Sequence, residues 1–231
     1  MKKKEIIQWI KSNKDLLPPD YNLDIINDSQ GIGIRVFKKG ETTIDIINIW
    51  IDKKNVYRKF IPLMNIPLIE NIVQPIFLKH KYRNSYNEND HGTIFLMSAE
   101  PEKFKETQPK YLPATIESEE DVIKLYRELN KYIKNVAEPF YKKWGDLKFL
   151  NSYIKTVPQM EIGDKITHGG YKKAVIFKLC NDPEYDKYIN WLYNILIKMY
   201  EKNKDGDIAY KRNADIIKEL KEVLDKTEPI C

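Results

Sequence analysis

Residues Gly31–Leu63 read GIGIRVFKKGETTIDIINIWIDKKNVYRKFIPL, and the prediction of the fold starts from this stretch. It holds three runs of apolar and β-branched residues, at 31–37, 43–51 and 56–61, separated by clusters of lysine with glycine, aspartate or asparagine. Runs bounded in this way are typical of consecutive antiparallel strands joined by turns. The stretch therefore predicts a β-meander.

The middle run, 43–51, is apolar on both of its faces. Side chains alternate along a strand, so Ile44, Ile46 and Trp50 lie on one side and three further isoleucines on the other. A strand that is apolar on both faces is typical of the interior of a sheet that other layers cover. We therefore expect an interior strand, covered on both sides.

Weaker patterns surround the meander. Apolar residues at 6–10 predict a short helix, and the run 21–27 predicts an opening strand. Proline cannot donate a hydrogen bond to an interior ladder, so Pro62 and Pro67 should end the meander.

The next segment is predicted to contain a short helix and a hairpin. Residues 66–73 have a helical pattern that Pro75 should break. The runs 76–83 and 93–98, joined by the polar loop 84–92, predict one more pair of strands.

Helical patterns replace strand patterns after residue 100. Residues 100–113 are rich in charged residues and interrupted by proline, which is typical of a connecting segment. Ser118–Asp121 has the form of a capping box, and the helix that it starts should kink or break at Pro139. Further helices are predicted at 147–154, 171–180, 185–199 (ended by 205–207) and 208–224.

Strands that precede helices indicate an α+β protein. We expect an N-terminal antiparallel β-meander sheet with a short leading helix, mainly within 1–100, and a C-terminal helical half at 114–228 packed against it. Because the two-sided apolar strand needs helices on the sheet, 1–231 is predicted to be a single unit.

The location is predicted from the apolar runs and the cysteines. No run approaches the roughly 20 apolar residues that span a bilayer, so no membrane partner is expected. Gln8 and Lys11 interrupt the apolar start, which does not fit a signal peptide. We expect a cytoplasmic chain in which Cys180 and Cys231 are free thiols, with no cofactor.

The chain has 39 Lys and Arg against 34 Asp and Glu, a net charge of +5. A basic balance favours anionic partners, although the richness in lysine, isoleucine, asparagine and tyrosine is also typical of an AT-rich genome. Successive turns of a meander lie at opposite ends of the sheet, so Lys38-Lys39 and Lys53-Lys54 should not form one patch.

Two basic clusters contain tyrosines, whose rings can stack on nucleic-acid bases. They are Tyr57, Arg58 and Lys59, and Lys81, Tyr82 and Arg83. The alternative is that these residues are solvated edge positions, because lysine at strand edges prevents pairing with other chains. We favour the second interpretation.

Three histidines are candidates for a site. His168 precedes Gly169-Gly170 at a helix start that also carries Lys172-Lys173, an arrangement that could hold an anion; the alternative is a simple turn into the helix. His80 and His91, with Glu88 and Asp90, match no recurrent ligand spacing, so no metal site is predicted.

Motifs for catalysis are missing from the sequence. It contains no glycine-rich phosphate loop, no nucleophile elbow and no zinc-protease histidine pair. No catalytic residue is therefore assigned, and an enzyme is the less favoured class.

Four segments of the second half carry a resemblance: AEPF at 137–140, DLKFLN at 146–151, GGY at 169–171 and NDPEY at 181–185. On these segments the chain resembles uncharacterised bacterial proteins of about this size, some of them immunity-like partners of toxins. The resemblance carries over no functional residue. Inhibitors of basic nuclease toxins are usually acidic, whereas this chain is basic.

Three functions follow as hypotheses. The first is an intracellular, non-enzymatic protein that binds another protein, in the manner of immunity proteins. The second is a nucleic-acid-binding protein that uses the two basic clusters. The third is an enzyme of an unrecognised family around His168 or around His80 and His91. The sequence predicts no oligomeric state.

Overall fold

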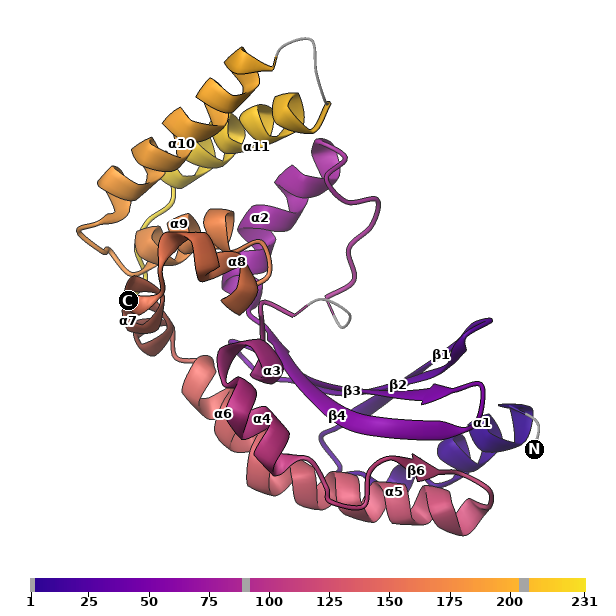
Figure 1. Ribbon diagram of the computed structural model, residues 1–231. Coiled ribbons are helices and arrows are strands. Elements are labelled where there is room, and N and C mark those ends of the chain that lie inside the picture. Colours follow the sequence, from indigo (N-terminus) through magenta and orange to yellow (C-terminus); the bar gives the residue numbers. More distant parts are fainter. Residues whose placement is uncertain (1–2, 89–91, 204–207) are drawn as a thin grey trace. The chain divides into compact units, whose positions relative to one another are not determined.

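The computed structural model of this chain describes residues 3–88, 92–203 and 208–231. They form two compact units, Met1–Asn65 with Ile94–Lys143 and Ile66–Thr93 with Trp144–Cys231. An antiparallel sheet follows a short helix in the first unit, and helices dominate the rest of the chain (Figure 1). The α+β architecture is therefore confirmed, whereas the joining of 1–231 into a single unit stays a prediction.

The sheet is the predicted meander. Its strands are antiparallel and neighbour one another in chain order: β1 Asn22–Asn27, β2 Gly31–Lys39, β3 Ile44–Asp52 and β4 Val56–Asn65. Two short strands, β5 Ile94–Phe95 and β6 Ala114–Thr115, pair with β4. Because β3 lies between β2 and β4, it is the interior strand that its two apolar faces predict.

Most of the apolar side chains of β3 are buried, on both faces. Trp50 is the exception, with 40% of its surface exposed. Its ring covers the main chain of β2, where a Cβ added at Gly33 would lie 3.2 Å from the ring. At Gly31 an added Cβ would lie 2.2 Å from the carbonyl oxygen of Ile51, so only glycine fits there.

Helices cover one face of the sheet in the first unit (Figure 1). α1 Lys3–Ser12 and α5 Glu119–Tyr132 are joined by the Tyr126 hydroxyl, which donates to the carbonyl of Ile10 at 2.8 Å. Tyr132 of α5 packs edge-on against Phe60 of β4 at 5.1 Å between ring centroids. The start of the helical half therefore packs on the sheet, as predicted.

The start and the irregularity of α5 follow the sequence. The hydroxyl of Ser118 accepts from the N–H of Asp121, and the Asp121 carboxylate accepts from the N–H of Ser118, so the capping box is confirmed. A π-helical segment, Ile133–Ala137, separates α5 from α6 Glu138–Trp144. It ends two residues before Pro139, whose missing N–H disturbs the regular helix there.

Pro62 lies inside β4, opposite Ile47 of β3, so the prediction that it ends the strand is wrong. The side chain of Gln108 bonds both main-chain groups of Phe60, which therefore point away from β3. Main-chain groups alternate along a strand, so Pro62 also turns its nitrogen away from β3. Its missing N–H removes no bond between β3 and β4.

The predicted break at Pro75 is also wrong, because α2 runs Pro67–Lys79 through it. Pro75 cannot donate to the carbonyl of Asn71, but both residues are exposed, so water can hydrate that carbonyl. Ile76 and Phe77 are buried on the opposite side of the helix. This burial stabilises the helix on both sides of the proline.

The hairpin predicted at 76–83 and 93–98 does not form. The first run is the end of α2, and the second contains only β5 and the short helix α3 Leu96–Ala99. The predicted connecting segment 100–113 is partly helical, as α4 Pro101–Thr107. Short apolar runs such as 76–83 and 93–98 fit a helix as well as a strand, and tertiary contacts decide between them.

The second unit is organised around one buried helix, α9 Gly169–Leu179. All of its residues from 171 to 177 are buried, and it contacts α2, α8, α7, α10 and α11. The bounds of the remaining helices are α7 Leu147–Thr156, α8 Ile162–Lys165, α10 Tyr185–Lys202 and α11 Ile208–Asp225. The four predicted helices of this half are confirmed; residues 205–207 lie outside the described part.

The prediction of two free thiols is wrong, because Cys180 and Cys231 form a disulfide. The N–H groups of Ile230 and Cys231 both donate to the carbonyl of Leu179, at 2.8 and 3.2 Å. These bonds hold the last residues at the end of α9 and bring the two Cα atoms to 4.7 Å. The two cysteines are 51 residues apart in the chain, so no local sequence pattern indicates that they meet.

Candidate functional site

Three of the residues proposed from sequence meet in the second unit: Tyr82, Arg83 and His168. Nη2 of Arg83 lies 2.8 Å from Nε2 of His168, and the rings of Tyr82 and His168 pack edge-on at 5.2 Å. Arg212 of α11 joins them, with its guanidinium 5.2 Å from the centroid of the Tyr82 ring. We call Tyr82, Arg83, His168 and Arg212 the arginine cluster.

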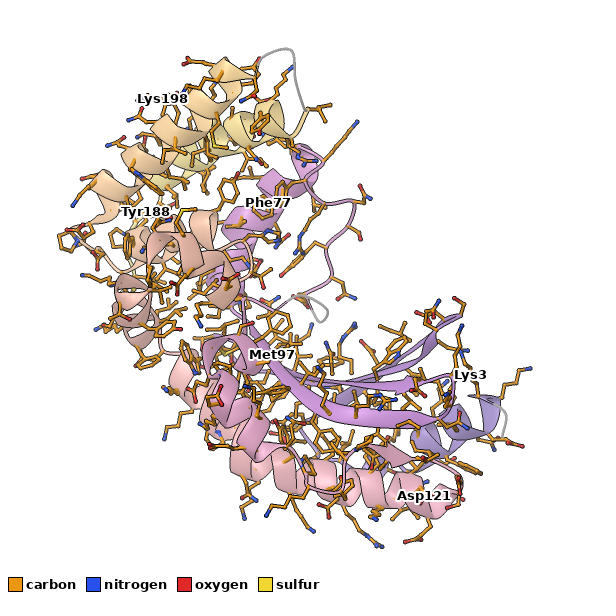
Figure 2. All side chains as sticks on the ribbon, viewed as in Figure 1. Lys3, Phe77, Met97, Asp121, Tyr188 and Lys198 are labelled. Atoms are coloured by element: carbon orange, nitrogen blue, oxygen red, sulfur yellow. A yellow bond between two sulfur atoms is a disulfide. The ribbon has the colours of Figure 1, made fainter. Side chains whose placement is uncertain are left out.

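The end of α2 places two members of the cluster. Lys81 adopts the left-handed conformation, with φ of 54°, which turns the chain back. The N–H groups of Tyr82 and Arg83 then donate to the carbonyl of Phe77, at 2.8 and 3.3 Å. Phe77, labelled on α2 in Figure 2, also packs edge-on against His168 at 5.1 Å.

The start of α9 places His168. This residue has φ of 56° and lies directly before the helix. A Cβ added at Gly169 would lie 2.3 Å from the carbonyl oxygen of Ile162, so glycine is required at this close approach. The left-handed residue and the close packing of Gly169 together fix the position of the imidazole.

The contact with Arg83 assigns the protonation of His168. A guanidinium has only donors, so Nε2 of His168 must accept this hydrogen bond. The imidazole is therefore neutral, with its proton on Nδ1. Both positive charges of the arginine cluster consequently belong to the two guanidinium groups.

Neither arginine forms an ion pair within the described residues. Nη1 of Arg83 and Nε of Arg212 are buried and have no hydrogen-bond partner there. Buried donors normally have an acceptor, and a guanidinium binds carboxylate or phosphate oxygens in a planar, two-pronged geometry. The arrangement is therefore suited to an anion.

The two lysines that follow His168 have other partners. Lys172 is buried and forms an ion pair with Glu70 of α2, which is also buried. The hydroxyl of Thr93 and the amide of Gln74 donate to the same carboxylate, each at 2.6 Å. Burial raises the pKa of Glu70, but the charge of Lys172 and these hydrogen bonds outweigh burial and hold the pKa below its ordinary value.

Lys173 points away from the cluster and donates to the carbonyl of Ile154 at 3.1 Å. Arg83 and Arg212 thus supply the positive charge that the sequence assigned to the two lysines beside His168. Arg212 lies among mixed charges on an amphipathic helix, and no local signal distinguishes it.

Of the other proposed binding residues, Lys81 lies in the turn after α2 in the second unit, and Tyr57, Arg58 and Lys59 lie in the first unit. Tyr57 is buried, so its ring is not available for stacking. Arg58 is paired with Asp52 at 3.4 Å, and Lys59 lies 6.0 Å from the ring of Phe104. The two strands that meet at each turn are antiparallel, so Lys38-Lys39 and Lys53-Lys54 lie at opposite ends of β3, as predicted.

His80, at the end of α2, pairs with α11 of the second unit. Its Nε2 is 2.7 Å from Oε2 of Glu219, which also pairs with Lys79 at 2.8 Å. His91 and Asp90 lie outside the described residues. Within 3–88, 92–203 and 208–231, no three His, Cys, Asp or Glu side chains gather as metal ligands would.

No family model, no curated protein and no solved structure matches this chain. Among the helices that the structure describes, none has both the length and the apolar character needed to cross a bilayer.

Proposed function

We propose that this chain is a binding protein that acts by contact with another protein, and that the arginine cluster receives an acidic side chain of that partner. The supporting observation is the pair of guanidinium groups beside Tyr82, each with a buried N–H that lacks an acceptor among the described residues. Arginine is enriched among the residues that contribute most to protein–protein affinity. The expected resemblance to uncharacterised bacterial proteins, some of them immunity-like, is in line with this class of function.

A protein partner explains the cluster better than a nucleic acid does. The guanidinium of Arg212 lies over the ring of Tyr82, and the ring of Phe77 packs against it with 4.6 Å between the centroids. These contacts leave little of the Tyr82 ring for stacking on a base. Binding along a nucleic-acid strand also requires a row of phosphate contacts, whereas the cluster holds two charges. The nucleic-acid and enzyme hypotheses stay predictions.

The test compares the wild-type chain with the double variant Arg83→Gln, Arg212→Gln as baits for proteins of the source cells. A specific protein partner should bind the wild-type chain after nuclease treatment and should be lost by the double variant. Truncating one side of a buried charged pair costs about 2–5 kcal/mol, which is at least a thirtyfold loss of affinity by order of magnitude.

Arg58→Gln is the matched control, because Arg58 is exposed and already paired with Asp52. It should retain the partner. Equal capture by the double variant would contradict the role of the cluster, and loss of all binding on nuclease treatment would favour the nucleic-acid hypothesis.

We propose the cytoplasm as the location of the chain. The Cys180–Cys231 disulfide is the opposing observation, because structural disulfides persist mainly in oxidising compartments. Recovery of the chain in the cytoplasmic fraction supports the proposal, and recovery in an oxidising compartment contradicts it.

A further inference from the structure

A cavity of about 610 Å³ lies within the second unit, where α7, α9 and α10 meet. Its volume is within the range of about 300–1,000 Å³ that is typical of small-molecule sites. Three aromatic residues and three lysines contribute to its wall: Phe177, Tyr188, Trp191, Lys155, Lys173 and Lys187. We call it the Lys173 cavity.

The aromatic side of the cavity is fixed in place. Tyr188, labelled in Figure 2, packs edge-on against Phe177 at 5.5 Å and lies 5.6 Å from Trp191. Its hydroxyl donates to the carbonyl of Gly170 at 2.9 Å and accepts from the amide of Gln159 at 3.0 Å. Trp191 is 39% exposed, so its ring offers surface on which a planar molecule can stack.

The charge of Lys173 is not neutralised within the described residues. This residue is only 7% exposed, and its ammonium lies 5.4 and 5.3 Å from the ring centroids of Phe177 and Tyr188. The carbonyl of Ile154 accepts one of its three N–H bonds. Burial lowers the pKa of Lys173 by more than the charge of Asp182 raises it, in keeping with a cation that has no directly paired carboxylate.

The nearest acidic group is engaged elsewhere. The carboxylate of Asp182 pairs with Lys155 at 3.0 Å and accepts from the amide of Asn151 at 2.7 Å. Its second oxygen accepts from the N–H of Glu184 at 3.0 Å. Lys187 lies at the rim with an 83% exposed side chain, 3.6 Å from Glu184, so Lys173 supplies the unbalanced charge.

We infer that the Lys173 cavity binds a small aromatic anion, with its ring against Trp191 and Tyr188 and its carboxylate or phosphate on the ammonium of Lys173. The site is separate from the arginine cluster and does not depend on the proposed function. An aromatic ring and an anionic group on one small molecule match the two features of the wall, and buried ligands of this kind need few polar contacts.

The experiment is isothermal titration calorimetry of the full chain, with its disulfide intact, using three naphthalene probes. 2-Naphthoate and 2-naphthyl phosphate carry the two anionic groups, and 2-naphthalenemethanol is the neutral control. At least one anion should bind about tenfold or more tightly than the alcohol, because a hydrogen bond to a charged group changes affinity by roughly 10- to 100-fold. The tighter of the two anions identifies the preferred headgroup.

Lys173→Met keeps the aliphatic stem and should weaken anion binding about tenfold or more. Lys187→Met is the matched control and should change it less than about twofold, because an exposed charge contributes little. If Lys173→Met does not fold, Trp191→Ala serves instead and should weaken binding about fivefold or more through lost stacking. The Arg83→Gln, Arg212→Gln variant should bind as the wild type does.

Equal affinity for the neutral alcohol, no binding of either anion, or unchanged binding in folded Lys173→Met would overturn the inference. Unchanged binding in Trp191→Ala would overturn it as well. Loss of anion binding in the Arg83→Gln, Arg212→Gln variant would assign the anion to the arginine cluster instead.

Discussion

Lys172→Met should destabilise the second unit by about 3–5 kcal/mol at pH 7, because it leaves a buried carboxylate without its cation. The side chains of Lys172 and Glu70 are 1% and 0% exposed. Methionine retains most of the aliphatic volume of lysine, so the change removes a charge and leaves little cavity. Thr93 and Gln74 still donate hydrogen bonds to Glu70, but they carry no charge.

The loss of stability caused by Lys172→Met should become smaller as the pH falls. The pKa of Glu70 lies below its ordinary value of 4.5, so its contribution to stability is present above pH 4.5 and is lost as the pH falls through the folded-state pKa. Without Lys172, burial remains and raises the pKa of Glu70, so the carboxyl becomes neutral more readily. The difference between variant and wild type should therefore shrink as the pH is lowered from 7 towards about 4.

Urea unfolding followed by circular dichroism, at pH 7 and at pH 4.5, measures both effects. The double variant Glu70→Gln, Lys172→Met should recover part of the loss, because no buried charge remains. The control is Lys105→Met: Lys105 pairs with Glu102 at 2.9 Å on the exposed surface, and its loss should cost less than about 0.5 kcal/mol. An unchanged unfolding midpoint for Lys172→Met at pH 7, or a double variant less stable than both single variants, would contradict this account of the buried ion pair.

Three further predictions concern other parts of the chain. Gly169→Ala should destabilise the second unit by about 1–3 kcal/mol in thermal unfolding, because the added Cβ would meet the carbonyl oxygen of Ile162. Gly170→Ala is the control and should be neutral or slightly stabilising, because space around Gly170 is open. Equal effects of the two variants would contradict this account of α9. Cys231→Ser should lower stability by about 2–4 kcal/mol in urea unfolding by releasing a loop of 51 residues, and a reducing agent should have no further effect on this variant. Burial raises the pKa of Asp45 to about 6, so the wild type should lose up to about 3 kcal/mol as the pH rises from about 4 to 6, because the unfolded chain releases this proton first. Asp45→Asn should abolish that part of the pH dependence; an identical pH profile in the variant counts against a buried Asp45.

Local sequence patterns predicted the sheet well. The runs of β-branched residues and the turn clusters between them specify β2, β3 and β4, because each strand pairs with its neighbour in the chain. The capping box at Ser118 is equally local, since its two hydrogen bonds span three residues. Patterns predicted the helix at 66–73 but failed at 76–98, where short apolar runs fit either kind of element and contact with α9 favours the helix.

The candidate site was predicted only in part. The sequence indicates Tyr82 and Arg83 because they lie in a basic cluster that contains a tyrosine. It indicates His168 because two glycines follow it. Arg212 does not stand out, because its contact with Tyr82 spans 130 residues and has no local signature. The pairing of Lys172 with Glu70 spans 102 residues and has no local signature either. Because Lys172 neutralises Glu70, it is not available for the anion that the sequence predicts beside His168.

Local sequence patterns predict the order and type of most elements, because hydrogen bonds between near neighbours and the alternation of side chains depend on consecutive residues. They do not predict which charges are neutralised, which rings are buried or which cysteines are joined. Those outcomes depend on distances between residues far apart in the chain, as at Cys180 and Cys231. The unbalanced cations Arg83, Arg212 and Lys173 became recognisable only after the partners of all other nearby charges were known.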